Sequence, residues 1–206
     1  MIYIYRSMNG SEPPVIDIPK YAGIYLQGNN LKFSELRDKY KEMYWGAYWV
    51  FNPISNQATE AYNFSNLING NAGTLPPSIQ VLLSGQLNWN NIITQLSSFF
   101  TEFKRWYKKP LIFETNLSTW NALYKFPIPS IIDDAPLLLW GTPSTGFTHP
   151  IALLSHDDNT IDFDGTKEEL LVWTQTYILP TPSNPTILTD SEKLDWIIQK
   201  MNSVFK

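Results

Sequence analysis

Short apolar runs alternate with helix-like patterns between Ile2 and Tyr177, the order typical of repeated strand and helix units. Eight runs have the length and the β-branched or aromatic content of strands: Ile2–Tyr5, Ala22–Gln27, Gly46–Phe51, Ile79–Leu83, Leu111–Glu114, Pro136–Trp140, Ile151–Ser155 and Thr160–Phe163. The sixth run is almost continuously apolar, as expected of a strand that is covered on both faces.

Helical patterns follow most of the first six predicted strands. Apolar residues at steps of three and four predict helices over Phe33–Tyr44, Gln57–Ile68, Ile92–Tyr107 and Asn116–Tyr124, and another helix begins after Asp164. Only a turn separates the last two strands. The pattern therefore predicts an α/β fold, a compact and partly irregular β/α (TIM-like) barrel, with an open α/β sheet carrying one antiparallel edge as the alternative.

The composition changes after the barrel pattern ends. We expect the barrel over 1–178, a Pro-rich linker over 179–188 and an amphipathic helix over 189–206. One stripe of that helix is apolar: Leu194, Ile197, Ile198, Met201 and Phe205. Because a helix this short is not stable alone, its apolar face is expected to dock on the barrel, on a second copy of the chain or on another protein.

Composition narrows the function classes. With 43% apolar and 17% charged residues, the 206-residue chain is a folded globular protein, and 15 basic against 19 acidic side chains without a basic stripe argue against nucleic acid as a partner. No cysteine is present and His149 and His156 are the only histidines, so no metal or cofactor is expected. Neither a signal peptide nor a membrane span is recognisable, which predicts a cytoplasmic protein or one assembled into a virion.

Four stretches resemble one enzyme family. Trp45–Phe51, Lys109–Phe113, Ala135–Trp140 and Thr160–Leu170 are similar to the strand motifs and closing motif of the glycoside hydrolase family 25 lysozymes, the Chalaropsis-type muramidases. The resemblance covers about residues 1–176. It implies a lysozyme-like β/α barrel and a cell-wall polysaccharide, peptidoglycan, as the partner.

The acids on which that family depends are absent. The resemblance implies an Asp-x-Glu pair on the fourth strand and an Asp on the first, because side chains two residues apart on a strand point the same way and reach one glycosidic bond. Here Gln80 and Leu82 stand where the pair is expected, no Asp or Glu occurs from Ala61 to Thr101, and the first carboxylate of the chain is Glu12. An amide donates no proton at neutral pH, so the sequence predicts an inactive relative.

Five residues are expected to line the mouth of the barrel and contact a ligand: Tyr48, Gln80, Glu114, Trp140 and Asp162. The function predicted is a catalytically inactive lysozyme-like module, a glycan-binding or structural component of a phage or prophage particle. The alternative is an active peptidoglycan hydrolase with relocated carboxylates, Glu114 as general acid and Asp162 as base or stabiliser. A third hypothesis is an architectural domain whose mouth is filled by its own side chains.

Overall fold

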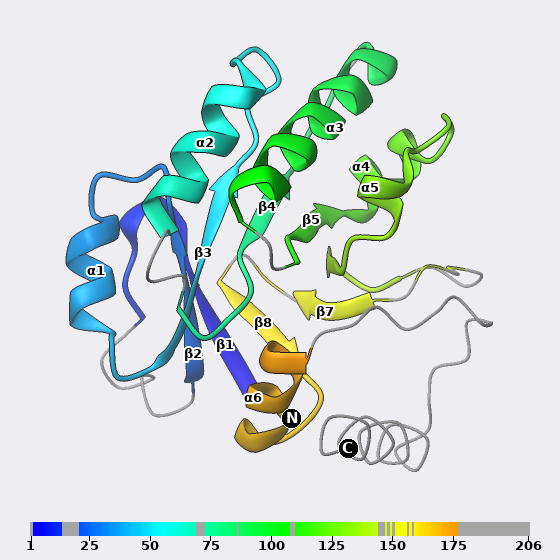
Figure 1. Ribbon diagram of the computed structural model, residues 1–206. Helices are drawn as coiled ribbons and strands as arrows, with labels where there is room; N and C mark the ends of the chain where they lie inside the picture. The colour runs from blue at the N-terminus through cyan, green and yellow to red at the C-terminus, as the bar shows by residue number, and fades with distance from the viewer. Residues whose placement is uncertain are drawn as a thin grey trace, which may run out of the picture.

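Eight strands form one closed barrel in the computed structural model (Figure 1). The structure describes residues 2–13, 21–68, 73–85, 87–107, 110–143, 147, 149, 151–155, 157 and 159–176. The strands follow the order of the sequence around the barrel: β1 (Ile2–Ser7), β2 (Tyr21–Gln27), β3 (Tyr44–Val50), β4 (Ser78–Val81), β5 (Ile112–Asn116), β6 (Leu137–Trp140), β7 (Ile151–Ser155) and β8 (Thr160–Phe163). The predicted barrel is confirmed, and the open sheet is wrong.

Strands β1 to β7 are parallel, whereas β8 runs antiparallel to both of its neighbours, β7 and β1. A parallel connection needs a crossover of a dozen or more residues, and only a turn joins β7 to β8. The Asp157 carboxylate accepts hydrogen bonds from the main-chain N–H groups of Asn159 (2.8 Å) and Thr160 (2.6 Å), which fixes this turn. The connection is therefore too short for a parallel crossover, and β8 runs antiparallel.

Helices cover the outside of the barrel (Figure 1). Their bounds are α1 (Phe33–Lys39), α2 (Gln57–Ile68), α3 (Trp89–Trp106), α4 (Leu117–Leu123), α5 (Ser130–Asp133) and α6 (Lys167–Thr176), and η1 (Met8–Gly10) is a 3-10 turn. The sequence pattern predicted neither η1 nor α5. The pattern also extended the first helix to Tyr44. In the structure Tyr44 begins β3, because the apolar residue that would continue the helix face belongs to this strand.

Helix α3 shows how local sequence produces one of these elements. The Asn88 side chain accepts a hydrogen bond from the Asn91 N–H (3.1 Å) and so caps the first turn. One face of the helix is apolar and buried: Ile92, Ile93, Leu96, Phe99, Phe100 and Phe103. This face packs between the strands and the neighbouring helices, as the predicted periodicity required.

Two hydrophobic clusters result from the alternation of side chains along the strands. The larger lies between the strands and the helices and includes Ile24 and Phe113. The smaller lies inside the barrel and includes Ile4, Leu138 and, from helix α6, Leu170. Helix α6 thus contributes an apolar side chain to the barrel interior.

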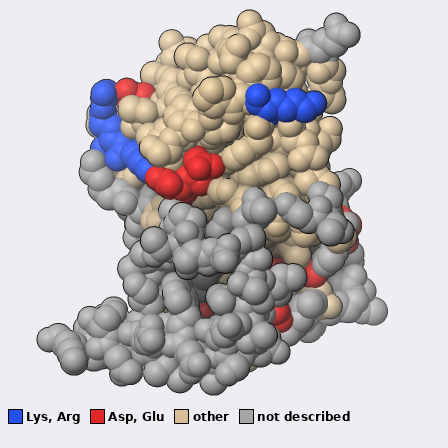
Figure 2. Space-filling view, turned by 90° about the vertical axis from the view of Figure 1, so that its right-hand side faces the viewer, with Lys and Arg blue, Asp and Glu red and all other residues tan. Residues whose placement is uncertain are grey.

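The predicted linker at 179–188 and the predicted helix at 189–206 lie outside the described residues. Within the described part, no helix combines the length and the apolar character needed to cross a bilayer. In the part of the face in Figure 2 that shows described residues, Lys, Arg, Asp and Glu side chains form a few small groups among uncharged residues.

Candidate functional site

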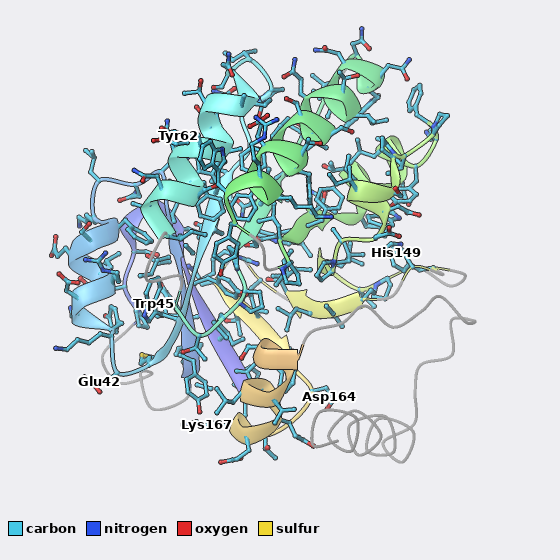
Figure 3. The ribbon with its side chains drawn as sticks, viewed as in Figure 1. Glu42, Trp45, Tyr62, His149, Asp164 and Lys167 are labelled. Atoms are coloured by element: carbon cyan, nitrogen blue, oxygen red, sulfur yellow. The ribbon has the colours of Figure 1, made fainter. Side chains whose placement is uncertain are left out.

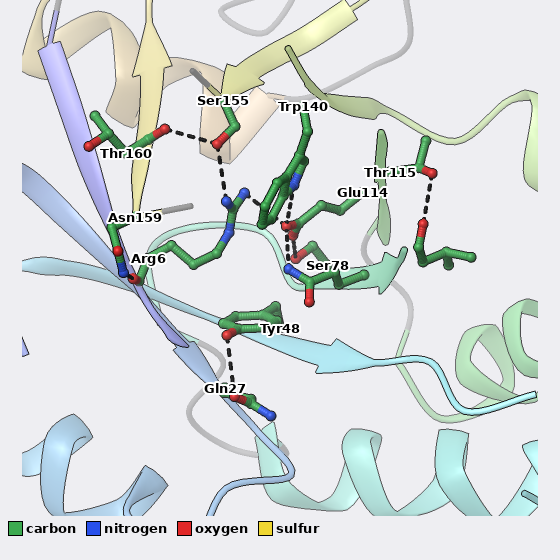
Figure 4. A network of polar contacts seen from close by, with 12 residues as sticks. Arg6, Gln27, Tyr48, Ser78, Glu114, Thr115, Trp140, Ser155, Asn159 and Thr160 are labelled. Atoms are coloured by element: carbon green, nitrogen blue, oxygen red, sulfur yellow. Dashed lines mark hydrogen bonds and ion pairs between the residues drawn. The ribbon is translucent and has the colours of Figure 1, made fainter. Parts of the chain in front are cut away.

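The inside of the barrel has an apolar layer and, beside it, a polar layer. On each of five strands, two side chains that are two residues apart both point into the barrel, because alternate side chains of a strand share a face. The pairs are Ile4 and Arg6, Ser78 and Gln80, Ile112 and Glu114, Leu138 and Trp140, and Leu153 and Ser155. The second members gather toward the carboxyl ends of β1 and β4 to β7 and form one hydrogen-bonded network (Figure 4).

Glu114 is the centre of this network. Its Oε1 atom accepts hydrogen bonds from Gln80 Nε2 (2.8 Å) and Trp140 Nε1 (2.9 Å), and its Oε2 atom accepts one from Ser78 Oγ (3.1 Å). The side chain is 1% exposed. Strand β5 continues two residues past Glu114, to Asn116, so this acid points into the barrel from within a strand and does not begin a loop.

Arg6 completes the coordination of Glu114. Its Nη2 atom lies 2.8 Å from Glu114 Oε1, and neither side chain is more than 1% exposed. Arg6 Nη1 donates to Ser155 Oγ (3.1 Å), and the guanidinium lies over the Trp140 ring, 4.1 Å from its centroid. Further hydrogen bonds compensate the loss of water around such a buried ion pair, and the network supplies three to Glu114 and one from Arg6 to Ser155.

Two buried tyrosines complete the interior around the ion pair. Tyr48 on β3 donates to the main-chain oxygen of Ser7 (3.0 Å), and Tyr25 on β2 donates to that of Pro76 (2.8 Å). Burial, assisted by the negative charge of Glu114, raises the pKa of both phenols well above the usual value. Both groups are therefore neutral hydrogen-bond donors at any physiological pH.

Four of the five residues predicted to line the mouth lie together. Gln80 and Trp140 contact Glu114 directly, and Tyr48 occupies the adjoining strand β3. Tyr48, Gln80 and Glu114 are nevertheless at most 4% exposed, and Trp140 is half-buried. Gln80 and Trp140 are hydrogen-bonded to Glu114, whereas the Tyr48 hydroxyl bonds the main chain of Ser7.

Asp162 lies apart from the other four. Its neighbour Ile161 belongs to the interior cluster, so the alternation of strand β8 directs Asp162 to the opposite face. In register it stands beside Tyr3, near the start of β1, and beside Leu154 of β7. Because β8 is antiparallel, its carboxyl end lies at the opposite side of the barrel from the carboxyl ends of β1 to β7. The structure does not bring Glu114 and Asp162 together on one face.

Three residues of the network were missed at the sequence level: Arg6, Ser78 and Ser155. The first predicted strand ended at Tyr5, one residue before Arg6. A signal was present, because Arg6 is the only basic residue and Glu114 the only acidic residue within strands β1 to β7 as described. Two opposite charges on apolar strands of one barrel predict a buried pair.

The network leaves Glu114 little capacity for acid–base chemistry. A general acid or base must present an oxygen to the ligand, whereas the Glu114 oxygens already accept three hydrogen bonds, and Oε1 is also paired with the Arg6 cation. In the described part of the chain, no group of three or more His, Cys, Asp or Glu side chains is placed to hold a metal ion. The geometry is that of a structural ion pair.

The fold defines the class: an eight-stranded β/α barrel with one reversed strand. No protein-family model and no curated protein matches the sequence. Solved structures do match: the family 25 glycosyl hydrolase from Bacillus anthracis has a TM-score of 0.70 at 15% identity, covering 83% of this chain and 92% of that chain. The muramidase from Acremonium alcalophilum has a TM-score of 0.67 at 14% identity, covering 84% and 99%.

A bacterial lysozyme from Streptomyces coelicolor is similar to the same extent, with a TM-score of 0.65 at 16% identity over 86% of this chain and 98% of that chain. The chain therefore has the fold of the family 25 lysozymes, as its sequence motifs predicted. At these identities the shared property is the fold.

Proposed function

We propose that this chain is a non-hydrolytic module with the lysozyme fold, a glycan-binding or structural component of a phage or prophage particle. The observation that supports this function is the state of Glu114, the one acid on strands β1 to β7 in the described residues. It is buried, paired with Arg6 and hydrogen-bonded on both oxygens. The lysozyme fold directs the choice of ligand class to cell-wall glycan.

Glycoside hydrolysis requires two carboxyl groups, about 5–10 Å apart, on either side of an accessible bond. Among the described residues, no second acid lies beside Glu114 at the carboxyl ends of β1 to β7, since Asp162 is on the other face of β8. Exposing Glu114 to a sugar would separate it from Arg6 inside the barrel. Breaking a buried ion pair costs about 3–5 kcal/mol, which substrate binding would have to supply before any chemistry.

Hydrolysis is tested on purified bacterial cell walls, by turbidity and by release of reducing ends, with an active lysozyme as positive control. We expect no loss of turbidity and no new reducing ends above a protein-free blank. A Glu114→Gln variant should give the same result as the unmodified chain. Release of reducing ends that disappears in Glu114→Gln would instead establish the active hydrolase and overturn the proposal.

Association with the wall is a separate measurement. We expect the full chain to sediment with insoluble peptidoglycan without degrading it. Because Tyr48, Gln80 and Glu114 are buried, substitution of Gln80 by Ala should change stability and leave the affinity of the folded protein for the wall unchanged. A selective loss of affinity in folded Gln80→Ala would show that glycan enters the barrel.

A further inference from the structure

We propose that the outer face of helices α2 and α3 is a carbohydrate-binding surface with Tyr62 and Trp106 as its aromatic platform. This site lies outside the barrel and is distinct from the network around Glu114. It rests on the proposed function only in the choice of cell-wall glycan as the ligand.

Tyr62 and Trp106 are two of the five large hydrophobic side chains that are exposed among the described residues. Tyr62 lies on α2 (Figure 3) and Trp106 is the last residue of α3, with exposed fractions of 47% and 55%. Their ring centroids are 5.3 Å apart and the rings meet edge to face at 73°. Each ring is held by the other while much of its surface stays in contact with water.

The helices beneath these rings pack directly on each other. Phe64 of α2 and Phe103 of α3 are in ring contact, with centroids 5.3 Å apart, and both are fully buried. Phe64 and Phe103 therefore fix the two helices one turn or less from the exposed rings. A platform on such a base loses little conformational freedom when it binds a ligand.

Amides, hydroxyls and a few charges surround the platform, with the charges on the Trp106 side. From Ala61 to Thr101 the chain contains no Asp, Glu, Lys or Arg, although solvent-facing helix surfaces ordinarily carry many charges. Charges lie beside Trp106 in the last turns of α3: Lys104 and Arg105 are exposed, and Glu102, 20% exposed, pairs with Arg105 at 2.9 Å. Amides and hydroxyls occupy most other exposed positions: Thr59, Asn63 and Asn66 on α2, and Asn90, Asn91, Thr94, Ser98 and Thr101 on α3. The one acid of α2, Glu60, accepts a hydrogen bond from Trp49 Nε1 (2.8 Å).

The two rings and the amide and hydroxyl side chains of the helices fit a sugar polymer. A pyranose ring has an apolar face of C–H bonds that packs on an aromatic ring, and its hydroxyl and acetamido groups exchange hydrogen bonds with amide and hydroxyl side chains. Binding to such a surface desolvates no buried charge. Two half-exposed rings are also far smaller than the roughly 800 Å² per partner of a stable protein interface, so a sugar chain is favoured over a protein.

The test is a titration of the full chain with the soluble tetramer of N-acetylglucosamine. Binding is measured by calorimetry and by the shifts of the indole N–H resonances in NMR spectra. We expect saturable binding that shifts the Trp106 resonance, and a loss of about tenfold or more in affinity in both Trp106→Ala and Tyr62→Ala. Ile54→Ala is the matched control, since Ile54 is a 91% exposed apolar residue outside both helices. Trp106→Phe should retain part of the affinity, because it keeps an aromatic ring.

Three results overturn the inference: no binding of the tetramer, equal binding by the double variant Tyr62→Ala with Trp106→Ala, or an equal loss in Ile54→Ala. Sedimentation that shows self-association abolished by Trp106→Ala would likewise overturn it, because the rings would then be a contact between copies. None of these results bears on hydrolysis, which the cell-wall assay measures separately. Release of reducing ends would refute the proposed function and leave the helical surface to be judged by its own titration.

Discussion

Substitution of Glu114 by Gln tests whether the ion pair inside the barrel is structural. Gln has nearly the same shape and keeps an oxygen for the donors Gln80 and Trp140, beside Arg6. Its amino group can lie against the hydroxyl of Ser78, which can turn to accept. The substitution therefore removes the negative charge beside Arg6 while packing and most hydrogen bonds remain. The change in the free energy of unfolding therefore reports the contribution of the negative charge of Glu114.

The expected loss follows from burial. Arg6 and Glu114 are 0% and 1% exposed, so water cannot replace the lost partner, and breaking such a pair lowers the free energy of unfolding by about 3–5 kcal/mol. In a protein of this size 1 kcal/mol corresponds to about 2–4 °C in Tm, so the midpoint should fall by about 6–20 °C. This loss is a large fraction of the total stability of a typical domain, about 5–15 kcal/mol.

Urea unfolding followed by far-ultraviolet circular dichroism and by tryptophan fluorescence gives the free energy directly. Glu102→Gln is the matched control, because Glu102 pairs with Arg105 at 2.9 Å on the surface, with side chains 20% and 63% exposed. The control should change stability by no more than about 0.5 kcal/mol. A loss of less than about 1 kcal/mol in Glu114→Gln would refute a structural ion pair.

Arg6→Met supplies the other arm of a double-mutant cycle. Alone it leaves the buried carboxylate without its cation and should be as destabilising as Glu114→Gln. Combined, the two changes should cost at least about 1 kcal/mol less than the sum of the single losses, because no isolated charge then remains from the pair. Simple additivity would show that the two side chains act independently.

Two further predictions concern the loops and the pH dependence of stability. Gly73→Ala should destabilise the chain by about 1–3 kcal/mol more than Gly85→Ala in urea unfolding, because both glycines have positive φ (75° and 92°) but only a methyl group at Gly73 meets main-chain atoms of β3, at Trp45. Burial lowers the pKa of His149, so below the unfolded-state pKa of about 6.5 the unfolded chain binds more protons and stability falls. Urea midpoints at about pH 5.5 and pH 7.5 should differ less in His149→Gln than in the unmodified chain, and an unchanged difference would exclude His149 as the cause.

The sequence predicted the elements well because each depends on nearby residues. The apolar steps of α3 place that helix within a few residues of its observed bounds, and the eight apolar runs all correspond to strands. The short spacing between the last two predicted strands also indicated that only a turn joins them. Helix ends were less certain, as at Tyr44, because an aromatic residue there suits either a helix face or a strand.

The candidate site was predicted only in part. Gln80, Glu114 and Trp140 were expected at one mouth because the carboxyl ends of parallel strands meet, and the structure brings them together. Asp162 was expected there too, but the direction of β8 and the alternation from Ile161 place it on another face. The partner of Glu114 was not predicted at all.

The amino-acid sequence by itself determined which segments are strands and helices, because propensity and alternation are local properties. It also excluded a carboxylate pair on the fourth strand, because no Asp or Glu occurs in that segment. Only the tertiary structure decided that Arg6, Glu114 and Ser155 meet, since Arg6 and Ser155 are separated by 149 positions and closure of the barrel alone joins them. The physical reason is that a charge buried among apolar strands must find its partner across the fold, and sequence spacing does not encode that distance.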